Sequence, residues 1–196
     1  HIARIRSHLD DRAVLNSLVV TLGGSFSRTW KECTLAGKDA RSEMLGLYFS
    51  HEDQHLEHWT VQDHKAPNTY SDLLYKGALA DESRAVYYGT IKVSEEARGT
   101  DAYQANRNLN LSPKAKADTN PQLEIATNDV RCTHGATVGK MDPEQLFYLN
   151  SRGIDKNTAE KLMVFGFFNE VLDRVKWSGM QENLAEVIRV KLEGAK

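Results

Sequence analysis

The sequence has few of the features that mark secreted, membrane or nucleic-acid-binding proteins. It contains two cysteines, Cys33 and Cys132, too few for a disulfide framework and suited to a reducing compartment. Its apolar runs fall short of the ~18 residues that a membrane-spanning helix needs, and Ile2–Arg6 alternates apolar and charged residues, unlike a signal peptide. The formal net charge of −2 argues against nucleic-acid binding through a broad basic patch. We therefore expect a cytoplasmic protein.

Motifs of the common enzyme classes are also missing. Gly23 and Gly24 are not followed by the lysine of a phosphate-binding loop, and neither a Gly-x-Ser-x-Gly nor a Cys-x-x-Cys pattern occurs. These absences indicate that the chain is not a stand-alone enzyme. Its first residue is His1 rather than Met and stands within a strand-like pattern, so we expect the chain to be a piece of a longer protein.

Short runs rich in β-branched residues fill the chain from Ile2 to about Thr137. Their centres lie roughly 10–20 residues apart, which suits a sandwich, a barrel or a solenoid. Small residues such as Gly46, Gly77 and Gly89 stand among them, as stacked coils need at corners. The pattern favours a mainly β protein built as a solenoid, and a jelly roll is the alternative. The expected strands are 14–22, 26–35, 44–49, 56–62, 73–79, 86–93, 107–111, 123–126 and 130–138.

The pattern changes to a helical period near residue 141. Asp142 and Pro143 form a helix start, and Gly153 suits the left-handed position that ends a helix. Asp155 can cap a second helix, and a third is expected from about residue 180. We expect a β core over residues 1–140 and a helical domain over residues 141–196. The apolar side of the last two helices is expected to contain Leu162, Phe165, Phe168, Leu172, Val175, Leu184, Val187 and Ile188.

Four histidines lie within fourteen positions: His51, His55, His58 and His64. Imidazoles at such spacing can bind zinc or iron, as in a metal-storing barrel of the cupin type. The simpler interpretation, which we favour, is a solvated, histidine-rich face of the solenoid without a metal. No metal site is therefore firmly assigned to these residues.

A second pair of candidates is Cys132 and His134, which share one face if the segment is a strand. A thiolate beside an imidazole can bind iron, but a buried cysteine next to a partly exposed histidine gives the same pattern. A carbohydrate-acting solenoid would instead need paired carboxylates on one face. Glu52 and Asp53 are the nearest candidates, although adjacent residues of a strand point in opposite directions. The asparagines of residues 106–110 fit turns or stacked amides.

Several ordered motifs resemble one known family. Residues 74–77 read LYKG, residues 100–112 read TDAYQANRNLNLS, residues 121–125 read PQLEI and residues 131–154 read RCTHGATVGKMDPEQLFYLNSRGI. In kind and order they are similar to the SufB/SufD family, whose members are non-catalytic scaffold subunits of iron–sulfur cluster assembly. The resemblance spans nearly the whole chain. It implies a right-handed parallel β-helix followed by C-terminal helices.

The residue after the motif histidine separates the two branches of this family. Here it is Gly135, which resembles SufD, whereas SufB usually has a glutamate; a SufB-type subunit is the alternative. The resemblance implies that His134 lies near the interface with SufB and helps to form the nascent cluster, as an iron ligand or proton carrier. Cys132 matches a neighbouring position. No tightly bound cofactor is implied, only transient iron or a nascent cluster shared with the partner.

The helical end of the chain resembles the family's docking surface for SufC, an ABC-type ATPase. Its candidate docking residues are Phe147, Tyr148, Arg152, Gly153 and Ile154, although Phe147 and Ile154 also suit packing against the last coil. The resemblance implies that ATP-driven pairing of two SufC subunits is transmitted through such tails to the interface between β-helices. We also expect that the isolated chain can form a homodimer, and that a plant protein of this kind would lie in the plastid stroma.

Overall fold

The computed structural model describes residues 1–177 and 179–194, and its first part consists of ten strands. The strands are β1 (Ile2–Leu9), β2 (Val14–Thr21), β3 (Phe26–Leu35), β4 (Arg41–Ser50), β5 (His55–His64), β6 (Tyr70–Leu79), β7 (Arg84–Val93), β8 (Thr100–Asn110), β9 (Lys116–Ile125) and β10 (Val130–Lys140). Odd-numbered strands form one sheet, in the order β1-β3-β5-β7-β9, and even-numbered strands form the other, in the order β10-β8-β6-β4-β2. All strand pairs are parallel.

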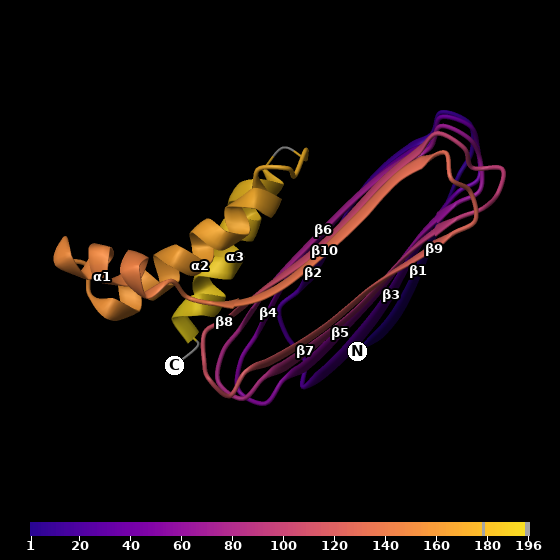
Figure 1. Cartoon of the computed structure of the whole chain (residues 1–196). Coiled ribbons are helices and arrows are strands. Elements are labelled where there is room, and N and C mark those ends of the chain that lie inside the picture. Colours follow the sequence, from indigo (N-terminus) through magenta and orange to yellow (C-terminus); the bar gives the residue numbers. More distant parts are fainter. Residues whose placement is uncertain (178, 195–196) are drawn as a thin grey trace.

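Consecutive strands alternate between the two sheets, so each pair of strands makes one coil of a parallel β-solenoid (Figure 1). This confirms the predicted solenoid. A jelly roll is wrong because its strands pair antiparallel, and a cupin-like barrel is wrong because these two sheets do not close on each other. The largest errors in strand position are in β8 and β9, which start at Thr100 and Lys116, well before the apolar runs that predicted them.

The space between the sheets is partly polar, which the sequence pattern did not predict. Asn106 and Asn108 of β8 are buried there. The Tyr48 hydroxyl donates to Asn108 Oδ1 over 2.5 Å and accepts from Asn106 Nδ2 over 3.0 Å. These asparagines therefore lie in the middle of a strand and not in turns, and they are held by a tyrosine rather than by an amide stack along the coils.

Two glycines make room for aromatic rings inside the solenoid. In the register of β4 and β6, Tyr48 pairs with Gly77 and Gly46 pairs with Tyr75. A side chain on Gly77 would collide with the Tyr48 ring, and one on Gly46 would collide with the Tyr75 ring. The prediction that such small residues stand at corners is wrong, because both lie mid-strand and serve close packing.

Three helices follow: α1 (Pro143–Ser151), α2 (Lys156–Leu172) and α3 (Met180–Gly194). The predicted caps are present, because the Asp142 and Asp155 side chains accept hydrogen bonds from the backbone N–H groups of Glu144 and Thr158. Gly153 has a φ of 87°, which suits the turn between α1 and α2. No helix among the described residues is long and apolar enough to cross a membrane.

Helices α2 and α3 cover the outer face of the sheet of even-numbered strands (Figure 1). The buried helix residues are Ala159, Val164, Phe168, Val171, Leu172, Ile188 and Leu192, and Val175 is buried in the segment between α2 and α3. Most of them pack on Leu45, Leu47, Phe49, Leu74 and Ala78 of β4 and β6. The expected apolar side was partly wrong, because Leu162 and Val187 are both 49% exposed. The three- and four-residue spacing found the helices and most of their buried faces, since Phe168, Leu172 and Ile188 are buried as expected.

Ion pairs fix α2 and the segment after it to the solenoid. Lys76 of β6 lies under α2 and pairs with Glu170 over 2.5 Å, and Arg107 of β8 reaches the same carboxylate over 2.8 Å. Arg174 pairs with Glu43 over 2.8 Å and with Asp72 over 2.6 Å. The helical end is thus tied to strands β4, β6 and β8 by charge as well as by apolar packing.

Candidate functional site

The last coil of the solenoid has two free strand edges. In the described part of the chain, β9 pairs only with β7, and β10 pairs only with β8. Their outer backbone N–H and C=O groups are therefore free to pair with another strand. This open end contains the candidate pair Cys132 and His134, both on β10.

Cys132 and His134 occupy inner-facing positions of β10, next to Ala102 and Gln104 of β8 in the strand register. Cys132 is half-buried and packs against the small cluster that closes this coil. Burial raises the pKa of the Cys132 thiol, and the nearby Asp101 carboxylate raises it further, so the thiol is protonated at neutral pH. His134 is exposed. The structure therefore presents an accessible imidazole beside a shielded thiol.

Two histidines of the other group are buried inside the solenoid. The His58 ring stacks on Tyr48 with ring centres 4.5 Å apart, and its Nε2 lies 3.0 Å from the Thr21 hydroxyl. The His64 ring nitrogens each lie 2.8 Å from a hydroxyl, that of Thr69 or Ser71. Burial lowers the pKa of both histidines to about 4. The favoured interpretation of a solvated histidine face is therefore wrong for these two.

The remaining members of that group lie elsewhere and form no metal site with them. His51 is in the turn after β4, and His55 starts β5 on its outer face, 3.2 Å from the Glu57 carboxylate. Within residues 1–177 and 179–194, no three His, Cys, Asp or Glu side chains are grouped so that they could hold a metal ion. The structure therefore does not bring the four histidines together as ligands.

The other weak candidates have structural positions. Glu52 and Asp53 lie in a solvent-exposed turn, where Glu52 has a φ of 56°, so they do not form the carboxylate pair that a carbohydrate-acting solenoid needs. Cys33 is fully buried, and its Sγ lies 3.4 Å from the Ser42 hydroxyl. Burial raises the pKa of the Cys33 thiol, so Cys33 is packed as a small buried side chain.

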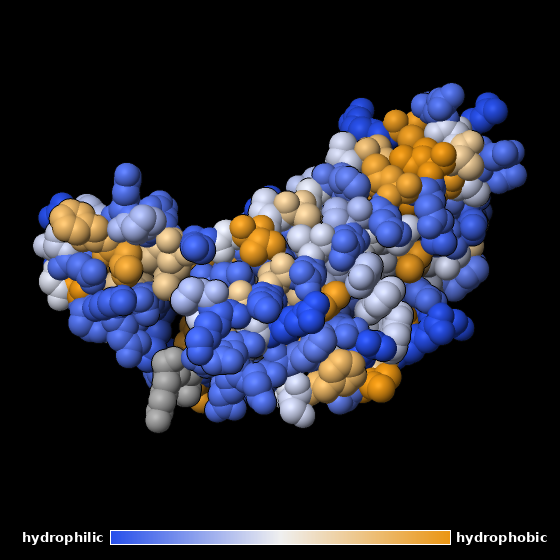
Figure 2. Space-filling model, turned by 60° about the horizontal axis from the view of Figure 1, so that its bottom comes forward, coloured by the Kyte–Doolittle hydropathy of each residue, from blue (hydrophilic) through white to orange (hydrophobic). Residues whose placement is uncertain are grey.

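Helix α1 exposes aromatic side chains. Phe147 is 74% exposed and Tyr148 is 56% exposed, and the Arg152 guanidinium lies 5.3 Å from the centre of the Tyr148 ring. The helix projects beyond the solenoid (Figure 1), and apolar side chains reach the surface at this end of the molecule (Figure 2). Packing of Phe147 against the last coil is therefore wrong, whereas Ile154 is half-buried.

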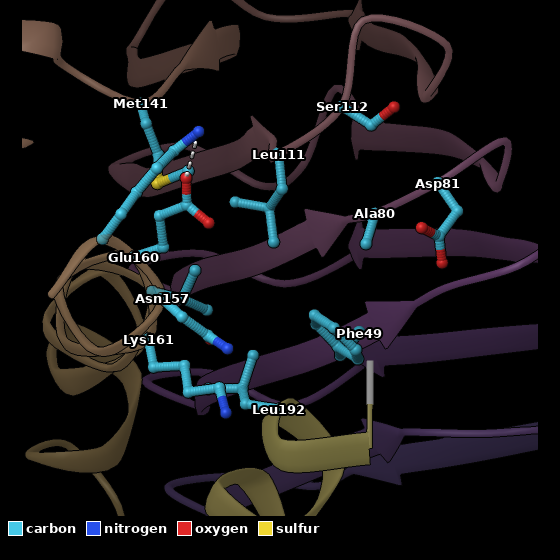
Figure 3. A pocket seen from close by; sticks show the side chains of 12 residues that line it. Phe49, Ala80, Asp81, Leu111, Ser112, Met141, Asn157, Glu160, Lys161 and Leu192 are labelled. Carbon is cyan, nitrogen blue, oxygen red and sulfur yellow. Dashed lines mark ion pairs between the residues drawn. The ribbon is translucent and has the colours of Figure 1, made fainter. Parts of the chain in front are cut away.

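A cavity of about 390 Å³ lies where α2 and α3 meet the turns of the solenoid (Figure 3). Apolar side chains such as Phe49 and Leu111 line its solenoid side, and Lys156 and Glu160 form an ion pair at the helix side. Histidine and cysteine do not occur among its lining residues. The cavity therefore has few of the ligand types that bind iron, and its lining includes neither Cys132 nor His134.

Fold and site together define a class of protein. It is a parallel β-solenoid with a helical tail held on it by ion pairs, and its candidate metal-binding side chains lie at an open strand edge rather than in an enclosed pocket. The family model for the SufBD core domain of the SUF system of iron–sulfur cluster assembly matches residues 1–167. The chain therefore belongs to the SufB/SufD family of iron–sulfur cluster assembly proteins.

Similar curated proteins agree with this family. An iron–sulfur cluster assembly SufBD family protein of Mycobacterium leprae is 38% identical over 98% of this chain and 51% of its own length. The iron–sulfur cluster assembly protein SufD of Escherichia coli is 34% identical over 88% of this chain and 41% of its own. SufD of Bacillus subtilis is 39% identical over 62% of this chain and 28% of its own. The chain therefore spans about half the length of the Mycobacterium leprae relative and less of the other two.

Some residues that shape the site were not found from the sequence. Gln104 lies beside His134 in the strand register. The ion-pair residues that hold the helical tail on the solenoid, called the clamp below, are Lys76, Glu170 and Arg174, and they join segments about 90 to 130 positions apart. Lys76 and Gln104 do stand inside the motifs that carried the resemblance. A single sequence contains no signal for contacts at such separations, because local periodicity extends over only a few turns of chain.

Proposed function

We propose that this chain is part of a SufD-type scaffold subunit that pairs with a SufB-type subunit through the open end of its solenoid. The observation that carries the proposal is the position of the candidate pair, because Cys132 and His134 lie on the strand whose outer edge is free. A free parallel edge pairs readily with a strand of another chain. In the absence of the partner, a second copy of this chain is the competing occupant of the same edge.

In this proposal His134 is the residue of the chain that meets the substrates iron and sulfide. Its side chain is exposed, and neutral imidazole is a good ligand for iron. Cys132 is the weaker candidate, because burial and Asp101 keep its thiol protonated and a thiol binds metal after it loses its proton. A scaffold of this type holds the nascent cluster between two subunits and transfers it, so no tightly bound cofactor is assigned to the chain.

The projecting helix α1 is the proposed docking surface for the ABC-type ATPase SufC. Exposed aromatic residues such as Phe147 and Tyr148 are typical anchors of protein interfaces. A movement of the ATPase would reach β8 through the Arg107–Glu170 ion pair, and β8 pairs along its length with β10. The tail can therefore couple ATP-driven motion to the strand on which His134 lies.

The first test is co-purification of the tagged full-length protein from its own cells, as wild type and as His134→Ala. We expect both forms to retain the SufB-type and SufC-type partners, and cluster formation to be lost in the variant alone. His8→Ala is the matched control, because His8 is exposed on β1. Absence of both partners from the wild-type purification would refute the complex, and normal cluster formation by His134→Ala would refute the role of His134.

A second test separates docking from assembly. Phe147→Ala is expected to weaken capture of the ATPase by about 30-fold, since losing an interface anchor costs about 2 kcal/mol or more, and to leave the SufB-type subunit bound. Leu162→Ala is the control, since Leu162 is another exposed apolar residue of the helical end but lies outside the candidate docking set. Equal retention of the ATPase by wild type and Phe147→Ala contradicts docking through α1.

A further inference from the structure

Gln104 of β8 has a buried amide group without hydrogen bonds. The side chain is 0% exposed, and neither its Oε1 nor its Nε2 has a hydrogen-bond partner. A buried polar group without a partner destabilises the fold, so each such group in a folded protein calls for a reason. An apolar side chain of the same size would avoid this cost.

Two other inner-facing amides of β8, those of Asn106 and Asn108, show that the interior can satisfy such groups, whereas Asn110 at the end of the strand also has an unpaired Oδ1. Asn106 Nδ2 donates to the Tyr48 hydroxyl and to the Tyr75 carbonyl, over 3.0 and 3.3 Å. Asn108 Nδ2 donates to Asn106 Oδ1 over 2.8 Å. Gln104 is the next inner-facing residue of the same strand, two residues nearer the start of β8 than Asn106, and it lacks partners of this kind.

The strand register shows which neighbours Gln104 has on either side. Its partner in β6 is Leu73, which has no polar side-chain atom, and its partner in β10 is His134. Adjacent strands lie about 4.8 Å apart, so side chains on the same face of paired residues are within reach of each other. Across the interior, Gly89 has no side chain, and one placed there would collide with the Gln104 amide. The space for this amide is therefore kept open.

We propose that Gln104 is a positioning residue for His134: its amide oxygen accepts a hydrogen bond from one ring N–H of the imidazole and leaves the other ring nitrogen free to face the partner subunit. The proposal rests on the proposed role of His134. A histidine that binds metal through one ring nitrogen commonly donates its other N–H to a fixed acceptor, which sets the tautomer and the ring orientation. Rotation of the exposed His134 ring toward β8 makes this bond when the open end is covered.

The test compares Gln104→Met with wild type in the full-length protein purified with its partners. The ring nitrogens of histidine are labelled with ¹⁵N, and the His134 signals are assigned by their loss in His134→Ala. Wild type is expected to show one dominant His134 tautomer, and Gln104→Met a mixture of the two. Gln62→Met is the control for loss of a buried amide away from His134, because Gln62 is equally buried and has an unpaired Oε1, and its register neighbours are Cys33 and Ile91. This control is the more disruptive change, because the Gln62 Nε2 donates to the Ser71 hydroxyl and to the Tyr103 carbonyl.

Cluster formation by the same complexes gives the second readout. Loss of such a supporting hydrogen bond costs about 10- to 100-fold in metal affinity or activity, so Gln104→Met is expected to slow assembly about tenfold or more. Gln104→Glu keeps an acceptor oxygen at the same reach and is expected to restore the single tautomer and most of the rate. An unchanged tautomer in Gln104→Met, or an equal change in Gln62→Met, overturns the proposal.

These outcomes also separate the two proposals. If His134→Ala forms clusters normally, the function proposed for His134 fails. The tautomer comparison between wild type and Gln104→Met still decides whether Gln104 holds the ring. If His134→Ala stops assembly and Gln104→Met leaves both the tautomer and the rate unchanged, the function stands and the positioning role is wrong.

Discussion

The ion pair between Lys76 and Glu170 should hold the helical tail on the solenoid, and its strength can be measured by a double-mutant cycle. The Lys76 side chain is 6% exposed, and its Nζ lies 2.8 Å from the Phe167 carbonyl oxygen, 2.5 Å from Glu170 Oε2 and 4.5 Å from the centre of the Phe167 ring. Glu170→Gln leaves this ammonium buried with a neutral partner. The Glu170 side chain is 43% exposed, so solvent screens part of the loss.

We expect Glu170→Gln to lower the free energy of unfolding by about 2 kcal/mol, within the range for hydrogen bonds to charged groups. Lys76→Met removes the buried charge itself and should cost only about 1 kcal/mol, because Glu170 keeps its pair with Arg107. The double variant should cost about 1–2 kcal/mol less than the sum of the single variants, since it leaves no buried charge unpaired. The measurement is urea unfolding of the four proteins.

Arg107→Met provides the control, because Arg107 contacts the same carboxylate from a more exposed position. Exposed ion pairs contribute about 0–1 kcal/mol, so this variant should be close to wild type. The reasoning is refuted if the two single changes add without coupling, or if Arg107→Met costs as much as Glu170→Gln. Either result would mean that burial of Lys76 does not determine the strength of the clamp.

Two further predictions concern the interior of the solenoid. Burial holds the pKa of His58 and of His64 at about 4, below the ordinary value of 6.5, so between those pH values the unfolded chain binds protons that the folded chain does not. Stability should therefore fall as the pH drops from about 6.5 to 4, by up to about 3 kcal/mol for each histidine. His58→Phe should remove about half of this pH dependence, measured by urea unfolding at pH 7 and pH 5. An unchanged pH profile in His58→Phe would count against a neutral His58. Gly77→Ala should lower the free energy of unfolding by about 2 kcal/mol or more, because the new methyl group would collide with the Tyr48 ring. Gly139→Ala is the control, because a methyl group there meets nothing within 4 Å, and it should be near neutral in thermal unfolding. Equal stability of the two variants would contradict the packing inferred for Tyr48.

Local chemistry in the sequence determined the element types. Runs of β-branched residues predicted where strands occur, and the change in the spacing of apolar residues after Lys140 predicted where helices occur. Asp142 and Asp155 fixed where two helices begin, because a cap depends only on residues within one turn of it. Ordered motifs around residues 100–154 indicated the family, which the family model over residues 1–167 confirms.

Strand ends inside the polar stretches were harder to predict from the sequence. The part of β8 before Arg107 contains Asp101, Gln104 and Asn106, which hydropathy assigns to loops. They belong to a strand because neighbouring coils supply its backbone hydrogen bonds on both sides and because part of the interior accepts amides. The same cause misled the interpretation of His58 and His64. The partner of His58 is Thr21 of β2, and those of His64 are Thr69, in the turn that follows, and Ser71, on the next strand.

The sequence alone determined the solenoid class, the helical end and the identity of Cys132 and His134 as candidates, because each depends on nearby residues or on motif order. The tertiary structure decided which histidines are buried, which helix residues face the sheet, and that Gln104 and His134 are neighbours. Those facts depend on register between coils about thirty residues apart, as in the pairing of Gln104 with His134. Stacking of whole coils sets that register, and no short segment of the sequence contains it.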